Sequence, residues 1–187
     1  TIAHMGFMLL GFASGVVGSD MVGAVDAYAA SLFYIVTYAI TTLGSFGVLM
    51  LASSRGFECE TLDDIKGLAK RHPWLGGIFL ILVFSLAGIP PTVGFYAKLA
   101  VLEAVVQAGH IWLAVVAVMA SLVGAFYYLR LVKVMYFDES KIETQLDCGK
   151  AASSLLTVNG LAVLLLGIFP GALMALCIYT VRISLAA

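Results

Sequence analysis

The sequence of 187 residues is 62% hydrophobic and only 11% charged, and its mean hydropathy of +1.06 lies far above that of ordinary soluble domains. Apolar runs near or above the ~20 residues needed to cross a hydrocarbon core of about 30 Å recur along the chain, which excludes a soluble domain of useful size. The formal net charge of −1 gives no reason to expect nucleic acid as a partner.

The apolar runs predict a single membrane domain over residues 1–187, an all-α polytopic transmembrane helical bundle. They are too long and too rich in Leu, Val and Ala to be barrel strands. In chain order, the predicted membrane segments are 2–18, 27–52, 74–107 with an interruption at 88–92, 111–137 and 153–169, followed by an apolar tail at 171–187. Aqueous loops are expected at about 53–73 and 138–151.

The first segment contains a histidine, His4, close to its start. An imidazole titrates near neutrality and can pass protons through either ring nitrogen, so His4 is a candidate for a proton path. A lone histidine at a helix end is equally well explained as a hydrogen-bonded structural residue, and the sequence leaves both interpretations open. His72 and His110 fall in connections, where we expect them to be solvated or interfacial.

The second segment carries a stripe of hydroxyl side chains at helical spacing. Its members are Ser31, Tyr34, Tyr38, Thr41 or Thr42, and Ser45. Such a stripe can line water between helices, or it can form hydrogen bonds across a packed seam. The sequence alone does not distinguish these two roles.

The third segment is interrupted by Gly88, Pro90 and Pro91. Proline lacks an amide hydrogen and pushes the residue before it away from α geometry, so one unbroken helix cannot pass through this stretch. The carbonyl groups freed at the break cannot face lipid, because each would cost several kcal/mol there. The interruption therefore predicts a discontinuous helix buried in a bundle, with a tight turn between two helices at the membrane surface as the alternative.

The distribution of basic residues bears on this choice. Lys and Arg lie in and around the two predicted aqueous loops, 53–73 and 138–151, whereas the other connections are bare of them. If 74–107 is one discontinuous crossing, both loops fall on the same side of the membrane, as the positive-inside rule requires. We therefore favour one interrupted crossing over two complete ones.

Lys98 follows the interruption, nine residues before Gln107, or roughly 14 Å along a helix. An ammonium near mid-bilayer costs at least ~2.5–3.5 kcal/mol, so it must be paired, hydrated or neutral, and such a group can be loaded with a proton and unloaded again. The alternative is a lysine that snorkels to a near interface. Glu103 lies closer to the helix end and is either an interfacial or intersubunit partner or part of the same proton path.

Other kinds of site have no support in the sequence. Cys59, Cys148 and Cys177 form no CxxC pair and are expected to be inert, and no metal site is indicated. There is no G-x-G-x-x-G stretch, P-loop or cysteine cluster for an iron-sulfur centre. Any redox chemistry coupled to this chain must therefore take place elsewhere.

Three stretches are familiar: FSLAGIPPTVGFYAKLAVLEA (84–104), VGAFYYLRLVKVMYFDE (123–139) and IAHMGF (2–7). In these motifs and their order the chain closely resembles the subunit N family of NADH-quinone oxidoreductase, called subunit 2 in mitochondrial complex I. The resemblance implies the second repeat of an antiporter-like fold, in which the lysine after GIPP, here Lys98, is a proton-channel residue. It also implies that His4 lies near a central hydrophilic axis.

The resemblance further implies a subunit that couples quinone reduction elsewhere in complex I to proton pumping, in the mitochondrial inner membrane or a bacterial plasma membrane. NADH, FMN, iron-sulfur clusters and quinone are then expected on other subunits, with no cofactor on this chain. Expected partners are membrane lipids and the other membrane subunits. We also expect a separate chain that supplies the N-terminal half, because we favour a naturally split subunit over a fragment of a longer one. Two alternatives remain: a cation/proton (Na⁺/H⁺) antiporter subunit, and a structural membrane subunit without a working channel.

Overall fold

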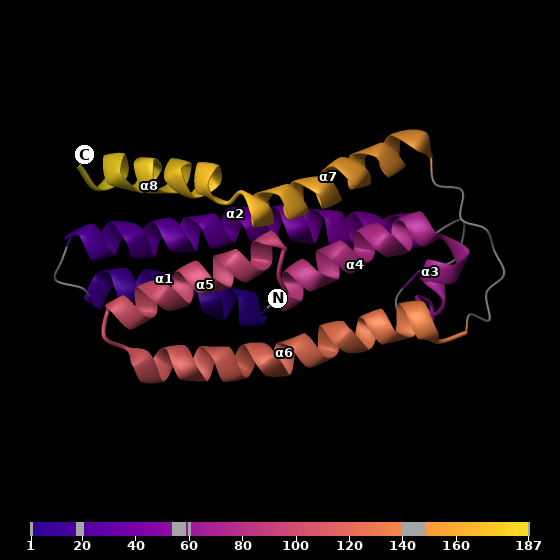
Figure 1. Ribbon diagram of the computed structural model, residues 1–187, viewed down its shortest axis with the longest axis horizontal. Helices are drawn as coiled ribbons and strands as arrows, with labels where there is room; N and C mark the ends of the chain where they lie inside the picture. Colours follow the sequence, from indigo (N-terminus) through magenta and orange to yellow (C-terminus); the bar gives the residue numbers. More distant parts are fainter. Residues whose placement is uncertain (1, 18–20, 54–58, 60, 140–148, 187) are drawn as a thin grey trace.

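The computed structural model describes residues 2–17, 21–53, 59, 61–139 and 149–186, and every regular element in these ranges is a helix. The helices are α1 (Ile2–Val17), α2 (Met21–Ala52), α3 (Leu68–Arg71), α4 (Pro73–Ala87), α5 (Val93–Gln107), α6 (Ile111–Phe137), α7 (Lys150–Ile168) and α8 (Gly171–Ala186). The bundle is organised along α2, which runs from one end to the other (Figure 1). On one side of α2 lie α1, α4, α5 and α6, and on the other lie α7 and α8 (Figure 1).

The helices follow the predicted segments closely, with differences at their starts. Helix α2 begins six residues before the predicted start at residue 27 and so includes Asp26, whose side chain is exposed. A single exposed carboxylate at the end of a bundle can be solvated, so it does not stop a helix. Helix α7 likewise begins at Lys150 rather than at residue 153, and the apolar tail forms the helix α8.

The predicted interruption separates α4 from α5. Helix α4 ends at Gly88, whose φ of +82° lies in the left-handed region that favours glycine. The amides of Gly88 and Ile89 both turn back to the Phe84 carbonyl at 2.9 Å, which closes the last turn. Helix α5 starts again after Thr92, whose backbone is extended. Two proline residues, Pro90 and Pro91, make up the middle of the link, where neither can donate an amide hydrogen bond.

The two halves form one interrupted pass through the bundle. Helix α4 leaves the end where α3 lies and stops near the middle, and α5 continues to the opposite end (Figure 1). The Gly67 amide, just before α3, donates to the Val134 carbonyl near the end of α6 at 3.4 Å. The basic residues of α3 and those of the last turns of α6 therefore lie at the same end of the bundle, as expected for one discontinuous crossing.

The second interrupted pass is made of α7 and α8. They also lie end to end, and they join near the middle of the bundle (Figure 1). The join is Phe169 and Pro170, and the Met174 amide donates to the Pro170 carbonyl at 3.0 Å. Proline at this point again removes one amide donor and ends the preceding helix.

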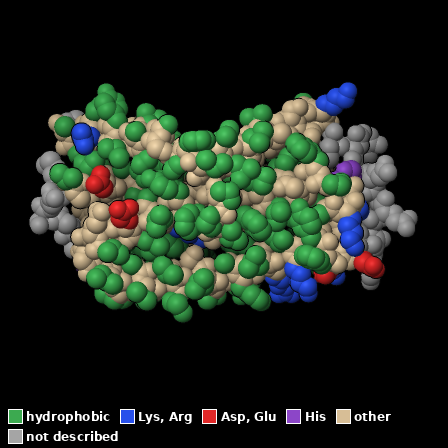
Figure 2. Space-filling view, viewed as in Figure 1, with side chains coloured by type: hydrophobic (Ala, Val, Ile, Leu, Met, Phe, Trp, Pro, Cys, Tyr) green, Lys and Arg blue, Asp and Glu red, His purple; other side chains and the backbone are tan. Residues whose placement is uncertain are grey.

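The packed centre of the bundle lies where α2 meets α4 and α5, with Phe33, Leu82 and Val101 fully buried. By contrast, the outer face of α6 exposes large apolar side chains, including Trp112 and Phe126. Hydrophobic side chains cover the middle of the surface, and most charged ones gather toward its two ends (Figure 2). Among the described residues, the helices long and apolar enough to cross a membrane are Val22–Ala52, Ile111–Phe137 and Lys150–Ile168.

Candidate functional site

Lys98 lies at the break of the interrupted helix. Its Nζ atom donates hydrogen bonds to the Ala87 carbonyl at 2.8 Å and to the Leu86 carbonyl at 3.3 Å, both in the last turn of α4. A third bond runs to the Ser121 hydroxyl of α6 at 2.9 Å. The lysine of one half-helix therefore caps the other half-helix, and a residue of α6 completes the set.

This arrangement explains how an ammonium is tolerated in an apolar bundle. The last carbonyl groups of a helix have no partner within it and carry the negative end of the helix dipole, so a cation placed there is stabilised. Among the described residues, the hydrogen-bond partners of Lys98 are two backbone carbonyls and one hydroxyl, and none is a carboxylate. Its charge is therefore held by neutral dipoles.

His4 lies in a second polar cluster, built from α1, α2 and α6. The Tyr34 hydroxyl is 2.9 Å from Nδ1, and the Tyr128 hydroxyl is 2.9 Å from Nε2. The Tyr38 ring stacks on the imidazole with a centroid distance of 4.7 Å. A neutral imidazole has one donor and one acceptor nitrogen, so one tyrosine must donate to His4 and the other must accept from it.

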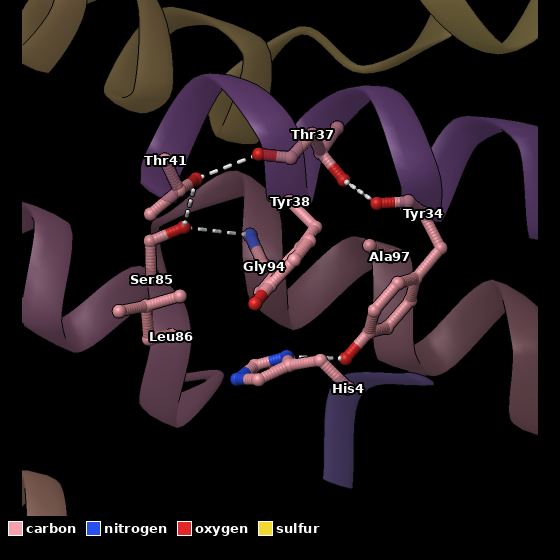
Figure 3. Close-up of a pocket in the computed structure, with 9 residues that line it drawn as sticks. All are labelled: His4, Tyr34, Thr37, Tyr38, Thr41, Ser85, Leu86, Gly94 and Ala97. Carbon is pink, nitrogen blue, oxygen red and sulfur yellow. Dashed lines mark hydrogen bonds between the residues drawn. The ribbon is translucent and has the colours of Figure 1, made fainter. Parts of the chain in front are cut away.

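A small polar pocket extends from His4 toward the break (Figure 3). It has a volume of about 10 Å³, which is near the lower limit for one water molecule. The Thr41 and Ser85 hydroxyls lie 3.4 Å apart in its wall, and the Gly94 amide donates to the Ser85 hydroxyl at 3.2 Å. Thr41 of α2 thus contacts Ser85, and Ser85 joins the two sides of the interruption.

A larger cavity joins the two clusters. Lys98 and His4 both line a space of about 250 Å³, together with Tyr34, Tyr128 and Ser121. Since a water molecule takes up about 30 Å³, this space can hold several of them. The cavity wall is mainly apolar apart from these groups, so water in it would be directed toward the lysine and the histidine.

The structure does not bring Glu103 to this site. Its side chain is exposed, accepts a bond of 3.4 Å from the Gln107 amide, and lines a separate cavity of about 170 Å³ with Asp26. Acidic side chains are seen together at that end of the bundle (Figure 2). Glu103 therefore belongs to the end of α5, whereas Lys98 belongs to its beginning.

The predicted stripe of hydroxyl side chains on α2 lines a pocket over only part of its length. Tyr34, Tyr38 and Thr41 line the pocket beside His4. Ser31 instead donates to the Met8 carbonyl of α1 across a packed seam, whereas Ser45 donates to the Thr41 carbonyl one turn earlier in α2 itself.

Three polar residues of the site were missed by the sequence analysis. Thr37 and Ser85 line the small pocket, and Ser121 binds Lys98. A signal for Ser121 existed, because it lies seven residues before Tyr128 and therefore on the same face of α6. Ser85 is the single hydroxyl side chain of α4 and comes just before the interruption, which could also have marked it.

Over the part of the chain that it describes, the structure offers no support for a metal centre. Among the residues that it describes, no three His, Cys, Asp or Glu side chains are grouped as metal ligands would be. Burial raises the pKa of the Cys59 thiol, and the nearby Asp64 raises it further, which disfavours the reactive thiolate. Cys177 is a buried free thiol in α8, and Cys148 lies outside the described residues.

Comparisons with known proteins agree with the resemblance seen in the motifs. NADH-quinone oxidoreductase subunit N of Cupriavidus taiwanensis is 61% identical over 185 residues, which are 99% of this chain and 38% of that protein. The subunit N of Herminiimonas arsenicoxydans is 54% identical over 186 residues, which are 100% of this chain and 38% of that protein. The chain thus spans about 38% of the length of these relatives.

Solved structures confirm the predicted all-α antiporter-like fold. A chain of respiratory complex I from Thermus thermophilus with bound Aureothin superposes with a TM-score of 0.71 at 24% identity, over 93% of this chain and 44% of that one. A chain of the Mrp complex from Dietzia sp. superposes with a TM-score of 0.73 at 19% identity, over 96% and 46%. Residues 1–124 match the family described as NADH:quinone oxidoreductase/Mrp antiporter, TM. The chain therefore belongs to the NADH:quinone oxidoreductase/Mrp antiporter transmembrane family.

Proposed function

We propose that this chain is the proton-transferring C-terminal part of subunit N of an NADH-quinone oxidoreductase, and that Lys98 is its central proton carrier. The observation that carries this proposal is the position of Lys98 at the break, where it shares one cavity with His4. The high identity to subunit N relatives supports the choice of complex I.

The proposed transfer uses two states of the lysine. In the charged state the ammonium is stabilised by the Ala87 and Leu86 carbonyls at the negative end of α4. In the neutral state the amine has a lone pair that accepts a proton from water in the cavity. Neighbouring subunits would drive the exchange by changing the local charge, because an approaching carboxylate favours the ammonium and its withdrawal favours the amine.

His4 would connect this cavity to the small pocket. Both of its ring nitrogens are already hydrogen-bonded to tyrosine hydroxyls, so a proton can arrive at one nitrogen while another leaves from the opposite one. Glu103, with Asp26, would exchange protons at the end of the bundle, where both carboxylates line one cavity.

The chemistry that supplies the energy would lie on other subunits. NADH, FMN, iron-sulfur clusters and quinone are assigned to them, and this chain would contact the other membrane subunits. The bacterial relatives favour the bacterial plasma membrane over the mitochondrial inner membrane.

Substitution of Lys98 tests the proposal. In the assembled complex, Lys98→Ala and Lys98→Met should abolish most NADH-driven proton uptake into inverted membrane vesicles, with complex content close to that of the wild type. Lys133→Ala, which removes an exposed lysine of α6, is the matched control and should pump normally. Normal pumping by an intact Lys98→Met complex would refute the role of Lys98 and favour a structural subunit.

The similarity to the Mrp complex motivates a second candidate, a cation/proton antiporter subunit. Purification separates the two. Co-isolation with flavin, iron-sulfur proteins and quinone reductase activity supports complex I, whereas Na⁺/H⁺ exchange without those components supports the antiporter.

A further inference from the structure

The two interrupted passes of the bundle touch at their interruptions. Gly167, in the last turn of α7, lies against the link between α4 and α5. A Cβ atom at residue 167 would lie 2.5 Å from the Thr92 carbonyl carbon and 2.6 Å from the Val93 nitrogen, and it would also collide with the Pro91 carbonyl oxygen. All three neighbours are backbone atoms, so no side-chain rotation can make room.

We propose that Gly167 is a positioning residue for Lys98. The bare backbone of α7 determines where the Pro91–Val93 link lies, and the link determines where Lys98 meets the end of α4. The inference deepens the proposed function and rests on it, because it assumes that Lys98 carries the proton.

The link is stiff enough to transmit such a displacement. The Thr92 hydroxyl is buried and donates to the Ile89 carbonyl at 2.7 Å. On the other side of the link, the Gly94 amide donates to the Ser85 hydroxyl at 3.2 Å. Val93 is the first residue of α5, and Lys98 follows five residues later in the same helix. A shift at Val93 therefore moves Lys98 relative to α4.

The size of the displacement follows from the contact distances. A side chain at residue 167 would require the link to move by about 1 Å to restore ordinary van der Waals separation. The bond from Lys98 to the Ala87 carbonyl is 2.8 Å long, and the one to the Leu86 carbonyl is already 3.3 Å. Hydrogen bonds weaken steeply beyond about 3.2 Å, so the ammonium would lose at least one acceptor.

The test compares two glycine substitutions on the same face of α7. Gly167→Ala pushes against backbone, whereas a Cβ at Gly160 would meet the Ile78 side chain at 3.3 Å, which can adjust. Both are made in the complete subunit of the assembled complex, in inverted vesicles. Loss of one hydrogen bond to a charged group predicts about tenfold slower pumping for Gly167→Ala. Gly160→Ala should stay within twofold of the wild type, and NADH–ferricyanide activity should be unchanged in both.

A double variant separates positioning from packing. If Gly167 acts through Lys98, adding Gly167→Ala to Lys98→Ala leaves the residual pumping unchanged, although the backbone clash lowers the thermal midpoint with or without Lys98. Residual pumping that falls further in the double variant than in Lys98→Ala alone would overturn the inference in favour of simple packing. Normal pumping by Lys98→Ala would instead defeat the proposed function. If Lys98→Ala pumps slowly but Gly167→Ala pumps within twofold of the wild type, the inference about Gly167 fails and the proposed function stands.

A second pair of variants applies if Gly167→Ala does not accumulate. Thr92→Val removes the hydroxyl that holds the link, and Thr92→Ser keeps it. Pumping should fall several-fold in Thr92→Val and stay within twofold in Thr92→Ser. Equal pumping by the two would show that the position of the link does not control Lys98.

Discussion

His4 is held by two tyrosine hydroxyls in unlike surroundings, and the two tyrosines should therefore respond differently to substitution. Both tyrosines line the 250 Å³ cavity, but Tyr34 is only 2% exposed whereas Tyr128 is half-buried. Both hydroxyls lie 2.9 Å from a ring nitrogen of His4. Tyr34→Phe would leave Nδ1 without a partner at a nearly inaccessible position, while Tyr128→Phe would leave Nε2 at a half-buried position that water can reach more readily.

The magnitudes follow from what replaces each hydroxyl. A buried group left without a hydrogen bond costs about 1–3 kcal/mol, which corresponds to roughly 5- to 150-fold in a rate or equilibrium. A water molecule that bridges the gap restores most of the enthalpy at a cost of about 0–2 kcal/mol. We therefore expect Tyr34→Phe to slow proton transfer by about tenfold or more, and Tyr128→Phe to slow it by no more than about threefold.

The assay is NADH-driven acidification of inverted vesicles, followed with a fluorescent pH-gradient probe and normalised to complex content. Tyr179→Phe serves as the control, because Tyr179 of α8 is 65% exposed and lines neither the pocket nor the cavity beside His4. A larger loss in Tyr128→Phe than in Tyr34→Phe would refute the reasoning from burial. Unchanged pumping in both would exclude His4 and its tyrosines from the proton path.

Two further predictions concern packing and the exposed loop. A Cβ at Gly44 would collide with Asn159 Oδ1, so Gly44→Ala should displace the Asn159 side chain and break its 3.1 Å hydrogen bond to the Ile40 carbonyl. The expected loss of stability is about 1–3 kcal/mol, measured as a lower thermal midpoint of the complex. Gly23→Ala is the control and should leave the midpoint unchanged, because a Cβ at residue 23 meets no neighbouring atom. The hydrogen bond from Lys66 to Asp63 and the Asp63 charge raise the pKa of Lys66, so Asp63→Asn should lower that pKa in a ¹⁵N NMR titration of the lysine amine. Because the pKa of Lys66 is raised in the folded protein, the pair stabilises the fold at lower pH, and this stabilisation is lost as the pH rises through the folded-state pKa. A stability difference between the wild type and Asp63→Asn that increased above that pH would contradict the ion pair as its cause.

Much of the architecture could be predicted because each helix carries its own signal. Length and apolar composition marked α2, α6 and α7, and Pro90 with Pro91 marked the interruption, since both effects act within a few residues of the chain. The start of α2 was placed too late because Asp26 is compatible with either a loop or an exposed helical position.

The partners within the site could not be predicted in the same way. Tyr128 and His4 are 124 residues apart, and Ser121 and Lys98 are 23 apart on different helices. Helical periodicity says which residues share one face of a helix, but not the rotation or offset of that helix against its neighbours. Glu103 illustrates the limit, because five residues along α5 were enough to place it in another cavity from Lys98.

By itself, the sequence determined that this is a membrane helical bundle with an interrupted helix at Pro90 and Pro91 and a lysine just after the interruption. Both features could be predicted because hydrophobicity and proline geometry are local properties. Only the tertiary structure decided that Lys98 caps the opposite half-helix, that His4 lies between two tyrosines, and that α7 lies against the link. These contacts depend on how whole helices pack, and packing is settled by the joint fit of many side chains distant in sequence.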